Sequence, residues 1–310
     1  LVAATGIGAS GAADIDTALG TLVATNNTSG DIYVQETNGL IIGGTGVRTL
    51  GGNGNINVDV TAGALDVNSV VTANGSGDVT LNAAGLLTVD AVVSSTTGDL
   101  SLTGGTGVTH TAAGDLTTTG VGTIGVTAST GDITMVGGTI YSTGSGTVTL
   151  LAATNVVLGE ITATSSAINV TATAGAITDA TPAADTTTNL TGGTVTLVAG
   201  TGIGATGATA DIDTAAVTLI STSGTGGTYV TEADGVALGS GAGGNASTGP
   251  IVIVAGGAIT TGNTITTTAN NAPISISNTA GAITISNAVT AHGSGDVTLN
   301  AAGLLTVDAV

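Results

Sequence analysis

The chain of 310 residues contains no cysteine, phenylalanine or tryptophan, and only three tyrosines. Without cysteine, no disulfide can hold the fold together. Without large aromatic side chains, a core has to consist of small and branched aliphatic residues that stack in thin, regular layers. These absences favour a fold that is stabilised by repetition rather than by one compact core.

Basic residues are even rarer than aromatic ones. Arg48 is the only one against 20 acidic residues, which gives a formal net charge of −19. Such a surface repels nucleic acid and anionic membranes, because no basic patch is present to neutralise phosphates. The same surface attracts divalent cations loosely. We therefore expect neither nucleic acid nor a membrane as a partner.

Long hydrophobic runs are missing as well. No stretch of 18 apolar residues occurs, so no membrane helix is expected. The sequence has no initiator methionine and no signal peptide at its start, and it stops within a repeat unit at Val310. We interpret it as a window of a longer protein. The lack of cysteine fits a secreted chain that is stabilised by length and stacking.

Glycine and small aliphatic residues are abundant. The chain has 53 glycines, and 41% of its residues are hydrophobic. Valine, isoleucine and threonine favour extended backbone, and glycine marks turns. A disordered chain lacks the aliphatic content that offsets the entropy of folding, and this chain does not lack it. The composition predicts an all-β protein.

Internal repetition is the strongest signal. Residues 75–92 read GSGDVTLNAAGLLTVDAV, and residues 293–310 repeat them without a change, 218 positions later. The segment that begins at Leu1 returns in similar form at Leu197, 196 positions later. The two shifts differ by 22 residues, which is the length of one structural unit. Self-similarity of this kind is typical of repeat architectures.

The repeat unit has three short strands. Units begin at positions 55, 78 and 99, and each contains an alternating strand, a glycine turn, a second strand, and a third short apolar stretch. Three strands in about 22 residues predict one coil of a parallel β-solenoid. In the coil that begins at Asp78, we expect the following side chains to point inward: Val79, Leu81, Leu86, Val89 and Val92.

One coil is present in the second copy only. Units that begin at positions 250, 273 and 296 are 23 residues apart, and the unit at Pro273 aligns with the unit at Asn55. The unit at Pro250 is therefore the extra one, over residues 250–272. We predict a single continuous solenoid over residues 1–310. Its parts are the copies 1–92 and 197–310, with divergent coils 93–196 between them.

The units DVTLNAAGLLTVDAVVSSTTG and PISISNTAGAITISNAVTAHGSG resemble the repeats of large secreted bacterial surface proteins. The similarity is to filamentous-haemagglutinin-type adhesins and to autotransporter passenger domains, and it covers most of the chain in style, without a motif of defined chemistry. The resemblance implies a right-handed parallel β-helix, export to the cell surface, and a role in attachment or in an extracellular layer.

Residues for catalysis are few. Catalysis by acids and bases or by nucleophiles needs a base beside its partner, and the only histidines, His110 and His292, lie far apart in the sequence. We expect both at surface corners. Polysaccharide-degrading β-helix enzymes are a remote alternative, because they need clustered carboxylates, basic residues or aromatic sugar platforms. We predict no catalytic residue, no bound cofactor, and a protein that is not an enzyme.

Aspartates suggest at most a weak metal site. Two Asp-x-Asp pairs recur in the motif ADIDT, and residues i and i+2 of a strand share a face, so each pair could hold Ca²⁺ loosely with backbone oxygens. The simpler interpretation is a solvated acidic face. Aspartate also follows glycine at many unit starts, where we expect it to cap a tight turn. The pairs are Asp14 with Asp16 and Asp211 with Asp213, and the unit starts are Asp31, Asp78, Asp99, Asp132 and Asp296.

These observations predict a structural or adhesive segment of a long extracellular β-solenoid rod at a prokaryotic cell surface. Its partners would be further coils of the same protein or like subunits stacked end to end. The alternative is a module that binds glycans or host surfaces through corner loops such as residues 181–189 or 240–249, the first of which contains Pro182.

Overall fold

The computed structural model describes residues 1–181, 187–207 and 209–308, and these residues form β-strands without any helix. Among them, no helix is present that is long and apolar enough to cross a membrane. Contacts divide the chain into two compact units: residues 1–153 with 162–164, and residues 154–161 with 165–310. Whether one solenoid continues over residues 1–310 stays a prediction, and each unit is described by itself.

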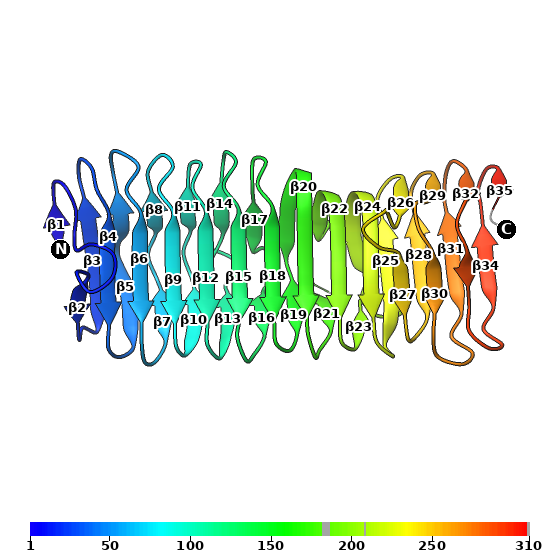
Figure 1. Ribbon diagram of the computed structural model, residues 1–310, viewed down its shortest axis with the longest axis horizontal. Helices are drawn as coiled ribbons and strands as arrows, with labels where there is room; N and C mark the ends of the chain where they lie inside the picture. The colour runs from blue at the N-terminus through cyan, green and yellow to red at the C-terminus, as the bar shows by residue number, and fades with distance from the viewer. Residues whose placement is uncertain (182–186, 208, 309–310) are drawn as a thin grey trace. The chain divides into compact units, whose positions relative to one another are not determined.

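Unit 1 is a parallel β-solenoid with three sheets, as the repeat predicts (Figure 1). Each coil from β6 onward contributes one strand to each sheet. The first sheet contains β2 (Ile15–Thr17), β4 (Ile32–Glu36), β6 (Ile56–Val60), β9 (Val79–Ala83), β12 (Leu100–Gly104), β15 (Ile124–Ala128) and β18 (Val148–Ala152). The second contains β7 (Leu65–Val67), β10 (Leu86–Val89), β13 (Gly107–His110) and β16 (Ile133–Met135).

The third sheet of unit 1 contains β1 (Val2–Ala3), β3 (Thr21–Asn26), β5 (Leu40–Thr49), β8 (Val71–Ala73), β11 (Val93–Ser95), β14 (Leu116–Thr118) and β17 (Ile140–Ser142). Strand β5 is long enough to pair with both β7 and β8, so it turns a corner between two sheets. All of these pairings are parallel.

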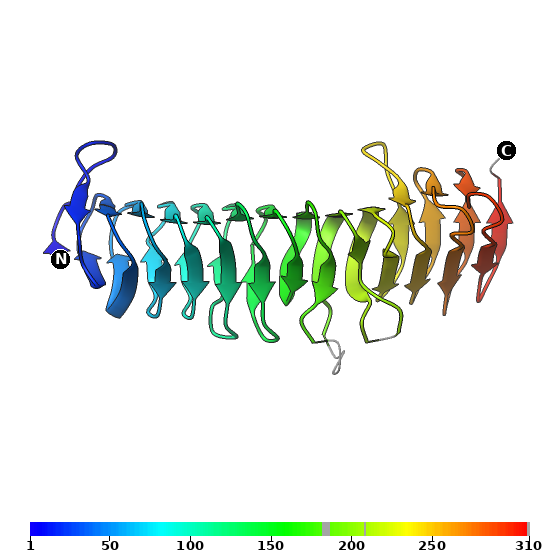
Figure 2. The ribbon, with the colours of Figure 1, turned by 90° about the horizontal axis from the view of Figure 1, so that it is seen from below.

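Unit 2 repeats this architecture (Figure 2). Its first sheet contains β19 (Val156–Leu158), β21 (Ile177–Asp179), β23 (Gly202–Ile203), β25 (Gly227–Glu232), β28 (Ile251–Ala255), β31 (Ile274–Asn278) and β34 (Val297–Asn300). The other two contain β26 (Val236–Leu238), β29 (Ile259–Thr261), β32 (Ile283–Ile285) and β35 (Leu305–Val307), and β27 (Asn245–Ser247), β30 (Ile265–Thr267) and β33 (Val289–Thr290).

Three longer strands complete the fold, and they are β20 (Glu160–Ala172), β22 (Leu190–Ala199) and β24 (Ile212–Ser223). Strand β24 pairs with β25, β26 and β27 in turn. Residues 250–272 form one whole coil of three strands, and its first strand, β28, pairs with β25 on one side and with β31 on the other. An inserted coil of this kind leaves every neighbouring strand in register, because side chains keep their alternation between the two faces.

The core consists of stacked aliphatic rows. Val79 pairs with Ile56 in the preceding coil and with Leu100 in the next, which gives coils of 23 and 21 residues, as the sequence predicts. All three side chains are buried. Rows of branched side chains in register remove apolar surface from water at every step of the stack.

Two inward positions were predicted wrongly. Leu87, not Leu86, points inward, because Leu87 is fully buried and Leu86 is 39% exposed. Likewise Val93 is fully buried and Val92 is only partly buried. Each error falls on a pair of identical apolar neighbours, where alternation alone does not say which one faces the core. The stacked partners decide it, since Leu87 pairs with the buried Leu65 of the coil before.

A column of glycines lines one corner of unit 1. A Cβ on Gly98 would lie 2.1 Å from the carbonyl oxygen of Gly77, and a Cβ on Gly77 would lie 2.1 Å from that of Gly54. The column continues at Gly122, whose Cβ would lie 2.0 Å from the oxygen of Gly98. The backbones approach so closely at this corner that no side chain fits.

The aspartates at the unit starts act between coils. The Oδ1 atom of Asp78 accepts a hydrogen bond of 2.8 Å from the backbone N–H of Asp99, and Asp31 accepts one of 2.7 Å from Asn55. Asp99 in turn accepts one of 2.7 Å from Thr123. The prediction was that these aspartates cap a tight turn, and at Asp31, Asp78 and Asp99 the backbone donor belongs to the next coil. Their carboxylates satisfy a backbone donor of the next coil, which sequence spacing alone does not reveal.

Candidate functional site

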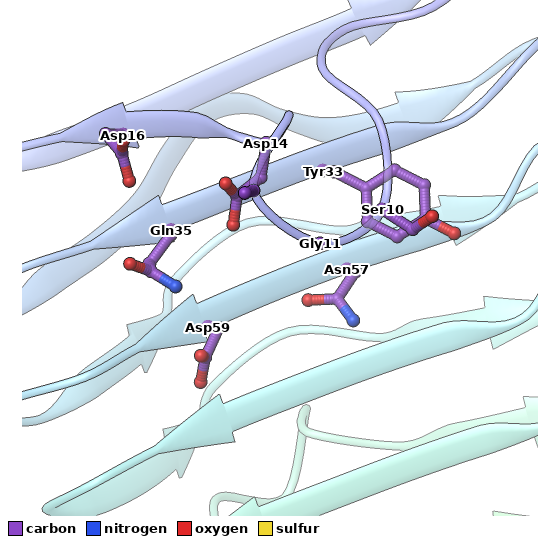
Figure 3. Close-up of a pocket in the computed structure, with 9 residues that line it drawn as sticks. Ser10, Gly11, Asp14, Asp16, Tyr33, Gln35, Asn57 and Asp59 are labelled. Atoms are coloured by element: carbon purple, nitrogen blue, oxygen red, sulfur yellow. The ribbon is translucent and has the colours of Figure 1, made fainter.

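Unit 1 has a polar surface groove of about 570 Å³ (Figure 3). It lies between a loop near residue 10 and the outward faces of β2, β4 and β6. The residues that line it are Ser10, Gly11, Ala12, Asp14, Asp16, Tyr33, Gln35, Asn57 and Asp59. Three carboxylates, two amides and one phenol therefore face one small area.

The strand register brings these side chains together. Asp16 pairs with Gln35, and Gln35 pairs with Asp59 in the following coil. Tyr33 pairs with Asn57 in the same way. Strands in a sheet lie roughly 4.8 Å apart, so residues one coil apart in the sequence become direct neighbours. Gln35, Asn57 and Asp59 were not identified from the sequence, and aligning successive coils by their outward positions could have found them.

The loop over the groove is held by backbone geometry. Gly8 has a φ of +68°, and a Cβ on it would lie 2.5 Å from the carbonyl oxygen of Tyr33. Ala9 donates a backbone hydrogen bond of 2.8 Å to Ala13. The loop therefore passes directly over the backbone of Tyr33 and closes on itself. Only glycine fits this position at both the dihedral angle and the distance.

The same loop recurs in unit 2 over a different floor. Gly204 has a φ of +61°, and a Cβ on it would lie 2.5 Å from the carbonyl oxygen of Tyr229. Beside this loop lies a pocket of about 250 Å³. Its lining residues are Ala205, Gly207, Asp211, Tyr229, Val230, Thr231, Val252 and Val254. The next strand after β25 belongs to the extra coil, so Val252 and Val254 occupy the places that Asn57 and Asp59 have in unit 1.

The four aspartates of the calcium hypothesis do not behave alike. Asp14 and Asp16 both line the groove of unit 1, although only Asp16 lies within a strand. Asp211 lines the pocket of unit 2. The backbone N–H of Asp213 donates a hydrogen bond of 3.0 Å to Oδ1 of Asn189. Within the described ranges, no group of three or more His, Cys, Asp or Glu residues could hold a metal ion. Calcium binding by these pairs stays a prediction.

Two equivalent glutamates have opposite pKa shifts. Burial by itself raises the pKa of Glu36, but hydrogen bonds from the Leu19 N–H and the Thr17 hydroxyl, with weaker ones from Asn38 and Thr37, bring the pKa below its ordinary value. The bonds from Leu19 and Thr17 are both 2.7 Å long. Each of these donors stabilises the charged form.

Glu232 occupies the equivalent place in unit 2, with fewer donors. Burial raises its pKa to about 7 against hydrogen bonds from the Thr214 hydroxyl and the Ala216 N–H, and the Asp234 side chain raises it further. The hydroxyl of Thr214 lies 2.6 Å from Oε2. Near neutral pH, this carboxyl therefore carries a proton part of the time. The sequence around Glu232 gives no sign that its pKa differs from that of Glu36.

His110 was predicted at a surface corner, and this is wrong. The side chain is fully buried, with Nδ1 at 2.7 Å from the carbonyl oxygen of Gly114 and the ring edge against Tyr141, at 5.1 Å between ring centroids. Burial lowers its pKa to about 4 despite the bond to Gly114. His110 occupies an inward position of β13, next to Val89 of the preceding coil. His292, by contrast, is exposed at its corner, as expected.

The predicted corner loops are shorter than expected where the structure describes them. Within residues 240–249, Asn245–Ser247 form β27, and Asn245 is fully buried. Only the turn around Ser240 and Gly243 projects as a loop, closed by backbone hydrogen bonds between these two residues. In the other loop, residues 182–186, with Pro182, lie outside the described residues. At the end of this loop, Asn189 is buried, and its side-chain amide donates a hydrogen bond of 2.8 Å to Oδ1 of Asp179.

Comparison of this chain with protein families, with curated proteins and with solved structures finds no match.

Proposed function

We propose that this chain is a structural and adhesive segment of a long β-solenoid on the outside of a prokaryotic cell. The observation that carries the proposal is that the strand register stays the same from coil to coil, for example from β6 through β9 to β12. Each coil offers the next a row of backbone donors and acceptors and a matching aliphatic layer. Such stacking makes a stiff, protease-resistant spacer without any chemical step.

The surface charge supports the same proposal. A formal charge of −19 with a single arginine keeps like rods apart in solution. Further coils of the same protein, or like subunits stacked end to end, are the partners that this geometry suits. The resemblance of the repeats to secreted adhesins points to the same location.

Labelling of intact cells tests this proposal. An antibody raised against the 310-residue chain should label intact cells of the source organism without lysis. The denatured protein that carries this stretch should have a mass far above 28.7 kDa. Labelling that appears only after lysis would contradict the location, and a mass close to 28.7 kDa would contradict the long rod.

Glycan binding is the second candidate, and the groove of unit 1 supports it. Tyr33 offers an aromatic face for a sugar ring, while Gln35, Asn57 and Asp59 offer planar acceptors and donors for hydroxyl groups. These polar groups lie on the rigid outward faces of neighbouring strands rather than on a mobile loop (Figure 3). The place differs from the corner loops that the sequence suggested.

Titration with glycans from an array tests this candidate. Asn57→Val with Asp59→Val gives the groove the floor that unit 2 has, and it should weaken glycan binding by about tenfold or more, since buried polar contacts are lost. The matched control is Ser275→Val, which adds a valine at an outward position of unit 2, two coils after Tyr229. This variant should leave glycan binding unchanged. Release of shortened sugars during the titration would favour the polysaccharide-degrading alternative instead.

A further inference from the structure

The groove of unit 1 has three carboxylates that a ligand can reach. Asp16 is exposed, and Asp14 and Asp59 are half-buried. Within the part of the chain that the structure describes, none of these three side chains forms a hydrogen bond or an ion pair. Arg48, the only basic side chain in the sequence, is not among the residues that line the groove. The groove therefore presents negative charge that a cationic ligand can balance.

This charge is spread along the groove rather than gathered at one point. Asp16 pairs with Gln35, and Gln35 pairs with Asp59, so the two aspartates lie two strands apart, which is about 10 Å. Figure 3 shows the three carboxylates apart from one another, with Gln35 among them. A metal ion needs ligands that converge on it, and no group of three acidic or histidine side chains in the described ranges does so. The spacing instead suits an extended ligand with several cationic groups.

The other walls of the groove narrow the choice of ligand. Tyr33 offers an aromatic surface for a sugar ring, and the amides of Gln35 and Asn57 offer donors and acceptors for hydroxyl groups. An ammonium group close to an aromatic ring gains further attraction. Acidic sugars are repelled by the three carboxylates, and a flexible polyamine has no hydroxyl groups for the two amides. A sugar that carries an amino group matches the carboxylates, the amides and the aromatic ring together.

We propose that the groove of unit 1 binds glycans whose sugars carry free amino groups, such as oligomers of glucosamine. The ammonium groups lie on Asp16 and Asp59, and the hydroxyl groups lie on Gln35 and Asn57. The proposal rests on glycan binding by this groove, the second candidate function, and it names the class of glycan. The net charge of −19 raises the concentration of such cationic sugars near the protein. The pocket of unit 2 has two valines in its floor, so we expect this specificity in unit 1.

Titration of the 310-residue chain with two β-1,4-linked tetramers tests the proposal by NMR. One tetramer consists of glucosamine and the other of glucose, so they differ only in an ammonium group in place of a hydroxyl group on each ring. At low ionic strength, and at a pH at which the amines are protonated, the glucosamine tetramer should bind about fivefold more tightly or more. The amide signals of Gln35 and Asp59 should shift saturably, and added salt should reduce the preference.

The two tetramers also separate this proposal from glycan binding itself. Equal binding of both would overturn the preference for amino sugars and would leave the groove as a glycan site. No saturable shift with either tetramer would overturn both proposals. Tetralysine, which has as many side-chain ammonium groups and no sugar hydroxyl, should shift the same signals at clearly higher concentration. Binding of tetralysine as tight as that of the glucosamine tetramer would indicate a basic peptide as the ligand and would overturn the proposal.

Replacing single charges shows which carboxylates recognise the amino groups. Asp59→Asn keeps the shape of the side chain and should lower the preference for glucosamine over glucose by about twofold or more. Asp66→Asn is the matched control, because it makes the same change at a half-buried position of the next strand, β7, outside the groove. This control should leave the preference unchanged.

A second variant covers failure of Asp59→Asn to fold. Asp14 lies outside any strand, and Asp14→Asn should lower the preference by a similar factor. An unchanged preference in both groove variants would overturn the proposal. An equal loss in Asp66→Asn would overturn it as well, because it would show that the overall charge of the protein, and not the groove, attracts the amino sugar.

Discussion

Residues 75–90 and 293–308 have the same sequence in different surroundings. In the first, β9 pairs with β6 on one side and with β12 on the other, and Leu87 is fully buried. In the second, β34 pairs with β31 alone among the strands that the structure describes, and the equivalent Leu305 is 41% exposed. Identical residues thus belong to a core in one coil and to a surface in the other. In a solenoid, burial is a property of the stack rather than of the coil.

The surroundings of polar side chains depend on the neighbouring coil in the same way. Tyr33 and Tyr229 lie under equivalent loops, but the next coil offers Asn57 and Asp59 to the first and two valines to the second. Glu36 and Glu232 are equivalent as well, and their pKa values move in opposite directions. Beside Tyr229, a whole inserted coil therefore keeps the fold and changes the chemistry of the neighbouring surface.

The largest expected effect separates the two identical segments. Leu87→Ala should lower the free energy of unfolding by about 2–5 kcal/mol, because it leaves a cavity in a closed core. Leu305→Ala should cost clearly less, since water already reaches that side chain. Chemical denaturation followed by circular dichroism measures both. Equal losses for the two variants would contradict the role of the covering coil.

Adding a coil after the second segment should make the two segments equivalent. When residues 93–118 are appended after Val310, the second segment is followed by the coil that follows the first, and Leu305 should become buried. In that longer chain, Leu305→Ala should cost about 2–5 kcal/mol, as at a core position. The same denaturation experiment measures this change. A cost that stays as small as in the 310-residue chain would show that stacking does not extend to the added coil.

The two histidines sharpen the comparison through pH. The pKa of His110 is about 4 in the folded chain, below the ordinary value of 6.5, so the unfolded chain binds a proton first. Stability should therefore fall as pH drops from 6.5 to 4, by up to about 3 kcal/mol from this side chain. His110→Asn keeps a donor for Gly114 and should remove this part of the slope. His292→Asn, at an exposed position, is the control for replacing a histidine by asparagine.

The two glutamates test the comparison through effects of opposite sign. The pKa of Glu232 is raised to about 7, so its contribution to stability is fully present below its ordinary pKa of 4.5 and is lost as pH rises through 7. The pKa of Glu36 is lowered, so its contribution is present above 4.5 and is lost as pH falls further. Glu232→Gln should flatten the stability curve between pH 5 and 7, whereas Glu36→Gln should lower stability at pH 7. Unfolding midpoints measured at both pH values check the two directions.

Much of the fold could be predicted from the sequence, and particular residues show where prediction failed. Alternating valine, leucine and threonine with regular glycines predicted three strands per coil, because these residues have strong local preferences. The identical neighbours Leu86 and Leu87 gave no preference, and the stacked partner chose between them. Of the candidate sites, the aspartates of the ADIDT motif were identified, but Gln35, Asn57 and Asp59 were not, since they meet only through the register of successive coils.

The sequence by itself determined the class of fold, the coil length and the acidic surface, because each depends on local preference, on repetition or on composition. Only the tertiary structure decided which coil covers which. That choice placed His110 inside, left Oδ1 of Asp211 without a hydrogen-bond partner among the described residues, and set the pKa values of Glu36 and Glu232 apart. The physical reason is that burial and hydrogen bonding in a solenoid come from the neighbouring coils, about 22 residues away along the chain.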